Sequence, residues 1–157
     1  MCKASLHAKE TRKAVAGEVL AVGTNTFGMG AFHPPATAIA ACLVCVEMGA
    51  ELTLANIPQK ARELYGLKDT EEALFYETEG SHSYVVHDLV MFPKRPDLGA
   101  LPLAHFAGPG VRATMKIVDA AEDAVEALKR MALAPQLVSQ TPTVDTLHER
   151  HLASLLS

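Results

Sequence analysis

The segment from Val22 to Ala38 holds the residues whose types and spacing are best suited to chemistry. It reads VGTNTFGMGAFHPPATA, with three glycines, then a histidine and two prolines. Backbone N–H groups of a loop that follows a strand and precedes a helix can hold an anion. The sequence therefore predicts a ligand-binding loop at 22–35 for a small anionic molecule. The candidate ligand-binding residues are Thr24, Asn25, Thr26, Gly28 and Gly30.

The same loop has a second interpretation, a tight packing turn. Its glycine spacing matches neither the dinucleotide-binding GxGxxG pattern nor the Walker loop. Pro34 and Pro35 remove two N–H groups, and no lysine or arginine lies between Gly23 and Pro35. Both interpretations remain open at this point.

Histidines are the other residues that could take part in catalysis. The candidate catalytic residues are His33, His87 and His105. A parallel sheet could bring His33 and His87 to one edge, where His105 could join them as a base or as a third metal ligand. The alternative is that these are ordinary, partly exposed histidines. We therefore assign no metal ligand and no cofactor.

Cys42 and Cys45 form a CxxC pair, the spacing of redox centres and metal sites. Within a helix the two thiols would share a face and could meet one metal. Redox pairs, however, lie at helix N-termini, and these two lie among Ala, Leu and Val. The favoured interpretation is two buried cysteines that act as small apolar residues. For His148 and His151, three apart in the tail, the favoured interpretation is likewise not a metal site.

The elements that would position these residues follow from proline, glycine and the apolar pattern. A strand within 16–24, a helix buried on all faces at 34–49 and a strand at 51–57 would form a βαβ unit. Asp69 and Glu72 have the spacing of a helix-capping box. The later predictions are a strand at 83–92, a loop at 93–102, two strands around the Gly-Pro-Gly turn with the second at 111–117, a helix from Asp119 to about 132 and a final helix from about 143.

These elements predict one α/β domain over residues 1–157. We expect a three-layer, Rossmann-like architecture with a mostly parallel sheet of four or five strands. Apolar residues make up 49% of the 157 residues and charged residues 20%, which is typical of a globular domain. Aromatic residues make up only 5%, so small side chains must fill the core.

Charge and hydropathy exclude some partners. The formal net charge is −4, and no basic stripe offsets it, which argues against nucleic acid. No apolar run approaches the roughly 20 residues of a membrane span, and the N-terminus lacks the apolar core of a signal peptide. We expect a cytoplasmic protein that binds no membrane.

The segment from Leu20 to Ile57, and especially AIAACLVCVEMGAELTL, resembles the first βαβ unit of the DsrE/DsrF-like proteins. The resemblance implies a Rossmann-like homo-oligomer, sometimes with a later-loop cysteine that carries persulfide sulfur. This chain has no cysteine beyond Cys45, so no catalytic residue is carried over.

The sequence thus predicts a small-molecule-binding or enzymatic domain of unassigned reaction, with its site at the loop 22–35. The alternative is a non-catalytic subunit of a homo-oligomer, or a DsrE/DsrF-like accessory protein of sulfur metabolism without the later cysteine. The apolar helix at 34–49 makes a homo-oligomer the expected assembly.

Overall fold

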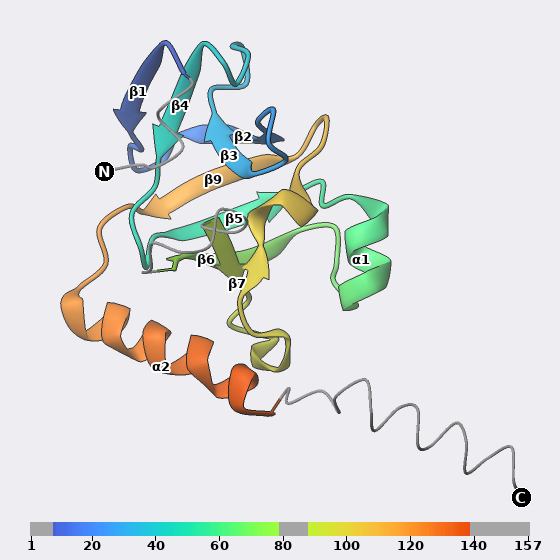
Figure 1. The fold of residues 1–157 in the computed structure, drawn as a ribbon, viewed down its shortest axis with the longest axis vertical. Helices are drawn as coiled ribbons and strands as arrows, with labels where there is room; N and C mark the ends of the chain where they lie inside the picture. Colours follow the sequence, from blue (N-terminus) through green and yellow to red (C-terminus); the bar gives the residue numbers. More distant parts are fainter. Residues whose placement is uncertain (1–7, 79–87, 139–157) are drawn as a thin grey trace, which may run out of the picture.

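The computed structural model describes residues 8–78 and 88–138, with side chains up to residue 131. Within these ranges the chain forms a nine-stranded sheet with two α-helices (Figure 1). The helices are α1 (Gln59–Tyr65) and α2 (Glu122–Val138), and the 3-10 turns are η2 (Pro96–Leu98) and η3 (Leu103–Phe106). The strands are β1 (Glu10–Lys13), β2 (Val19–Thr24), β3 (Gly30–His33), β4 (Cys42–Cys45), β5 (Glu51–Ala55), β6 (Glu71–Glu77), β7 (Asp88–Met91), β8 (Leu101–Pro102) and β9 (Arg112–Ile117).

The strands are ordered β1-β4-β3-β2-β9-β5-β6-β7-β8 in the sheet. β1 and β4 pair in parallel, and every other pairing is antiparallel. Of the strands in the described residues, β9 is the last along the chain, yet it lies between β2 and β5. The prediction of a three-layer, Rossmann-like α/β domain with a mostly parallel sheet is therefore wrong.

Alternation along the central strands explains the antiparallel sheet. Leu52 and Leu54 of β5 and Met115 of β9 are buried, whereas Thr53 and Thr114 between them are partly exposed and pair across the two strands. One face of an antiparallel sheet commonly meets the core and the other meets solvent. The predicted strands within 16–24, 51–57 and 111–117 are confirmed as β2, β5 and β9.

The sheet curls so that η3 packs against β2 and β3. A side-chain carbon added at Gly30 would lie 2.5 Å from the backbone nitrogen of Ala104, so the two backbones are in direct contact. Gly108 N–H donates to Val22 O at 3.2 Å, and the rings of Phe92 and Phe106 meet edge to face inside. Only a glycine permits this approach of β3 to η3.

The segment 34–49 is not a helix. Residues 35–38 are exposed turns, and β4 follows, packed between β1 and β3. A short apolar run such as CLVC suits a buried strand as well as a buried helix, and periodicity alone does not separate them. The segment CLVC forms a strand because it pairs with β1 on one side and β3 on the other.

Two further element predictions are wrong. Asp69 and Glu72 do not begin a helix, because β6 starts at Glu71 and alternates buried Ala73 and Phe75 with more exposed residues. The first strand predicted near the Gly-Pro-Gly turn is the 3-10 turn η3. The strand predicted at 83–92 is present as β7 for the part that the structure describes, and the loop at 93–102 contains η2 and the two-residue strand β8.

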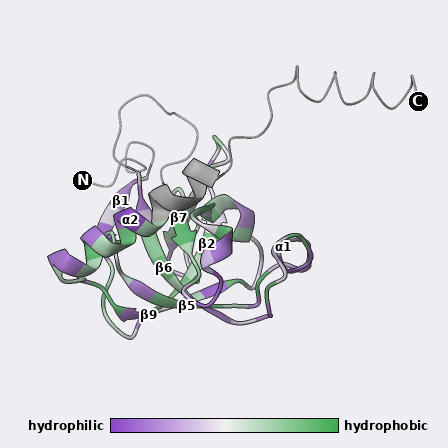
Figure 2. Cartoon of the chain, turned by 90° about the horizontal axis from the view of Figure 1, so that it is seen from below, coloured by the Kyte–Doolittle hydropathy of each residue, from purple (hydrophilic) through white to green (hydrophobic). Residues whose placement is uncertain are grey.

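The helix predicted from Asp119 is confirmed as α2, although little of its surface is buried. Leu128 is buried against Met91, whereas Ala121 is exposed and Met131 is 40% exposed. Figure 2 shows hydrophilic and hydrophobic residues alternating along this helix. Neither α1 nor α2 is both long and apolar enough to cross a membrane. The final helix predicted from about 143 lies outside the described residues.

Candidate functional site

The glycine-rich loop is a β-hairpin between β2 and β3, and no helix follows it. The Asn25 side-chain oxygen accepts the N–H groups of Phe27 at 2.9 Å and of Met29 at 3.0 Å. Gly28 N–H donates to Asn25 O, and Asn25 N–H donates to Met29 O. These N–H groups stabilise the turn itself and are not free for an anion. Ligand binding by this loop stays a prediction. The helix N-terminus that supported it is not present, because turns and β4 follow β3.

Of the other candidates in the loop, Thr24 closes the hairpin by pairing with Gly30, and Thr26 is exposed at its tip. The Asn25 side-chain nitrogen is buried and has no hydrogen-bond partner among the residues that the structure describes. Because two N–H groups point at the other amide atom, that atom must be the oxygen, and the orientation of the amide is fixed.

His33 ends β3 and holds the turn after it. Its Nδ1 lies 2.9 Å from Thr37 O and 3.0 Å from Pro34 O. Carbonyl oxygens only accept hydrogen bonds, so Nδ1 must carry the hydrogen. Nε2 faces β2, where a side-chain carbon added at Gly23 would lie 3.1 Å from it. The His33 ring is therefore hydrogen-bonded to backbone carbonyls of the turn that follows it.

His105, in contrast, contacts a side chain from a distant part of the chain. Tyr65, the last residue of α1, places its hydroxyl 2.5 Å from His105 Nδ1. The two rings are nearly parallel, at 15°, with centroids 6.1 Å apart, and Tyr65 also packs on Phe106 at 5.9 Å. Tyr65 is partly buried and His105 is exposed. Burial raises the pKa of Tyr65, so the phenol is neutral and can donate its hydrogen to Nδ1.

A second hydrogen bond joins the same two segments. Asn56 Nδ2 donates to Gly110 O at 2.8 Å, and Pro58 packs on Gly108. Asn56 has a left-handed backbone, with φ of 59°, which costs a residue with a side chain roughly 1–2 kcal/mol. We call the cluster of Asn56, Tyr65, His105 and Gly110, with the fully buried Phe106 ring beneath it, the α1–η3 junction.

The predicted catalytic histidines are not shown to converge. Ala104, next to His105, packs on Gly30 at the start of β3, whereas His33 lies three residues, or about 10 Å, further along that strand. His105 contacts Tyr65, and His33 contacts its own loop. His87, like His148 and His151, lies outside the described residues.

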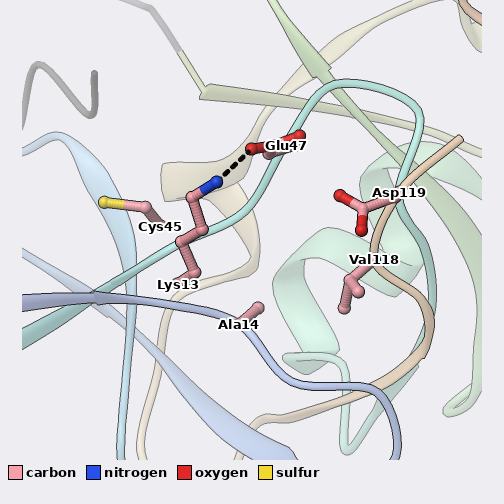
Figure 3. Close-up of a pocket in the computed structure, with 6 residues that line it drawn as sticks. All are labelled: Lys13, Ala14, Cys45, Glu47, Val118 and Asp119. Carbon is pink, nitrogen blue, oxygen red and sulfur yellow. Dashed lines mark ion pairs between the residues drawn. The ribbon is translucent and has the colours of Figure 1, made fainter.

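Cys42 and Cys45 lie on a strand, where residues three apart point to opposite faces. Cys42 is buried, and Cys45 lines a shallow hollow beside Lys13 and Glu47 (Figure 3). Lys13 Nζ lies 3.3 Å from Glu47 Oε1, and the sulfur points away from this pair in Figure 3. The hollow measures about 80 Å³, well below the roughly 300 Å³ of a small-molecule pocket. This arrangement does not support a shared metal or a disulfide between the two cysteines.

Glu77 and Asp88 face each other across β6 and β7. Burial and the neighbouring Glu77 charge raise the pKa of Asp88 to about 7. Glu71, Glu72 and Glu77 all lie on β6. Within 8–78 and 88–131, no three His, Cys, Asp or Glu side chains are grouped closely enough to hold a metal ion.

Sequence reasoning missed Tyr65 and Asn56. The one local signal is the pair Tyr65–Gly66, where Gly66 has a left-handed φ of 65° and ends α1. That signal marks the end of a helix, but it does not show which residue the tyrosine meets.

The fold and the site together define a curled, mixed but mainly antiparallel sheet domain with a tyrosine–histidine pair on its surface. No protein-family model, no curated protein and no solved structure gives a significant match to the chain. The Rossmann-like fold implied by the DsrE/DsrF-like resemblance is not the fold observed, and membership of that family stays a prediction.

Proposed function

We propose that this chain is a small-molecule-binding domain whose site is the α1–η3 junction. The observation that carries this proposal is the contact between the Tyr65 hydroxyl and His105 Nδ1, at 2.5 Å, on an exposed surface. Two polar side chains from segments 40 residues apart meet there, and Tyr65 is supported from below by the fully buried Phe106 ring. A few converging polar groups are a common feature of binding sites.

The pair favours ligands that accept hydrogen bonds. When the imidazole is neutral, Nδ1 accepts the Tyr65 hydrogen, so Nε2 carries the ring hydrogen. When the imidazole is protonated, both nitrogens carry one. His105 Nε2 therefore offers a donor in both states. A small molecule with a carboxylate or phosphate group fits this donor, in keeping with the small anionic ligand that the sequence predicts.

The test is an NMR titration of the full chain with a panel of small carboxylates, phosphorylated metabolites and nucleotides, followed at the His105 ring. We expect at least one compound to shift the His105 signals and to lose affinity about tenfold in Tyr65→Phe, which removes one hydrogen-bonding group. His105→Gln should weaken the same compound.

The matched control is His33→Gln, because His33 is a partly exposed histidine bonded within its own loop. If that variant loses affinity as much as His105→Gln, the site belongs to the hairpin rather than to the junction. If no compound in the panel shifts the His105 signals, the proposed binding function is wrong.

A non-catalytic role in a homo-oligomer, a sulfur-metabolism role and a cytoplasmic location remain predictions from the sequence. The homo-oligomer expectation rested on a buried apolar helix at 34–49, and that segment is instead turns and β4. We assign no reaction to the Tyr65–His105 pair.

A further inference from the structure

We propose that Arg95, held by Asp97, is the positioning residue that places Tyr65 against His105. The inference rests on the proposed function only in taking the α1–η3 junction as the site. The contacts on which it rests lie within the chain itself.

Arg95 binds the carboxyl end of α1. Its Nη1 donates to Tyr65 O at 3.1 Å and to Gly66 O at 2.9 Å. The last carbonyls of a helix have no partner within the helix, and the helix dipole favours a cation beside them. Gly66 leaves room for this contact, since a side-chain carbon added there would lie 3.1 Å from Nη1.

Asp97 fixes the direction of the guanidinium group. Arg95 Nε donates to Asp97 Oδ1 at 3.0 Å, and Nη2 donates to Oδ2 at 2.9 Å. This two-pronged pairing leaves Nη1 for the two carbonyl oxygens. A lysine has neither the fork nor the planar geometry to make both contacts at once.

The helix depends on such external contacts because it has only seven residues. Isolated helices of this length are not stable in water. Asn56 anchors the chain before α1 through Gly110, and Arg95 anchors its end. Tyr65 is the last helical residue, so a shift of the Arg95 end moves the Tyr65 hydroxyl relative to His105.

The experiment compares Arg95→Ala, Arg95→Lys and Asp97→Asn in the full chain without ligand. The readout is the tautomer of His105, measured from ring ¹⁵N signals at about pH 8.5, above the usual range of imidazole titration. The wild type should show one tautomer, with hydrogen on Nε2, because Tyr65 donates to Nδ1. Arg95→Ala should give a mixture of both tautomers, and Arg95→Lys and Asp97→Asn should give a smaller change in the same direction.

Glu18→Gln is the matched control, because Arg12 and Glu18 also form a two-pronged pairing elsewhere, through Nη1 and Nη2 of Arg12 at 3.0 and 2.8 Å. Thermal unfolding of all variants separates a general loss of stability from the local effect. We expect Glu18→Gln to lower the melting temperature and to leave the His105 tautomer unchanged.

An unchanged His105 tautomer in folded Arg95→Ala overturns the proposal. If Arg95→Ala does not fold, Arg95→Lys and Asp97→Asn decide by the same criterion. A tautomer change in the Arg95 variants together with a failed ligand panel supports the positioning role and removes the binding function. The two proposals therefore fail separately.

Discussion

Two histidines of this chain use the same ring atom in opposite ways. His33 Nδ1 meets carbonyl oxygens and must donate, whereas His105 Nδ1 meets a neutral tyrosine hydroxyl and accepts on the neutral ring. The sequence singled out both residues, yet it could not separate these roles. Each role depends on atoms that the fold brings to the ring, a nearby turn for His33 and residue 65 for His105.

We predict that neutral His33 carries its hydrogen on Nδ1, the tautomer opposite to that of His105. The physical reason is that Thr37 O and Pro34 O are both within 3.0 Å of Nδ1 and can only accept. Ring ¹⁵N spectroscopy at about pH 8.5 distinguishes the two tautomers. A His33 ring with hydrogen on Nε2 would show that the turn after β3 is held in another way.

At the scale of elements, the sequence predicted what local patterns determine. Alternation and flanking glycines located β2, β5 and β9, and the charged, capped segment after Asp119 located α2. It failed for 34–49 because CLVC is too short and too uniformly apolar to show a period. The prediction failed at Asp69 because Asp69 and Glu72 have capping-box spacing, but the run EEALFYE, which includes Glu72, alternates as a strand does.

The direction of pairing and the partner of Tyr65 could not be predicted either. Both depend on contacts between residues that are distant in the sequence, such as β2 with β9 and Tyr65 with His105. His105 is the predicted catalytic residue that contacts a side chain from a distant segment. Its prediction rests only on its being a histidine near a turn. Nothing in its neighbourhood indicated a tyrosine.

The β6–β7 pair makes stability depend on pH. In the folded chain the pKa of Asp88 is raised to about 7 by burial and by Glu77, above the roughly 3.9 of an unfolded aspartate. The folded state therefore binds more protons than the unfolded state between these values. The stabilising contribution is fully present below about pH 4 and is lost as the pH rises through about 7.

We predict that Asp88→Asn removes this contribution to the pH dependence. Urea unfolding at about pH 4.5, 6 and 7.5 should show that the free energy of unfolding of wild type falls more with rising pH than that of the variant. In Glu77→Gln the free energy of unfolding should fall at lower pH than in wild type, because the neighbouring negative charge that raises the pKa of Asp88 is removed. Equal slopes for Asp88→Asn and wild type in this range would contradict the prediction.

At the scale of the whole molecule, β3 and η3 are in direct contact through their backbones at Gly30 and Ala104. We predict that Gly30→Ala lowers the free energy of unfolding by about 2 kcal/mol or more, since overpacking typically costs 1–3 kcal/mol. The added carbon would lie 2.5 Å from Ala104 N and 2.7 Å from the carbonyl carbon of Leu103. These are backbone atoms, so η3 must move, and the His105 ring signals should move with it.

Gly28→Ala is the control for this prediction. Gly28 has φ of 77° and open space around it, so alanine there meets only backbone strain of roughly 1–2 kcal/mol. Chemical denaturation measures both variants, and the His105 signals should stay unchanged in Gly28→Ala. If Gly28→Ala disturbs His105 as much as Gly30→Ala does, direct contact between β3 and η3 does not hold the junction.

The position of β9 has a consequence for how the chain is made. A ribosome synthesises β2 and β5 long before residues 112–117, yet these two strands meet only through β9. Until β9 emerges, each of them has an unpaired edge able to join another chain. We therefore expect the central sheet to be completed only after β9 emerges, and the unpaired edges of β2 and β5 to be exposed to other chains until then.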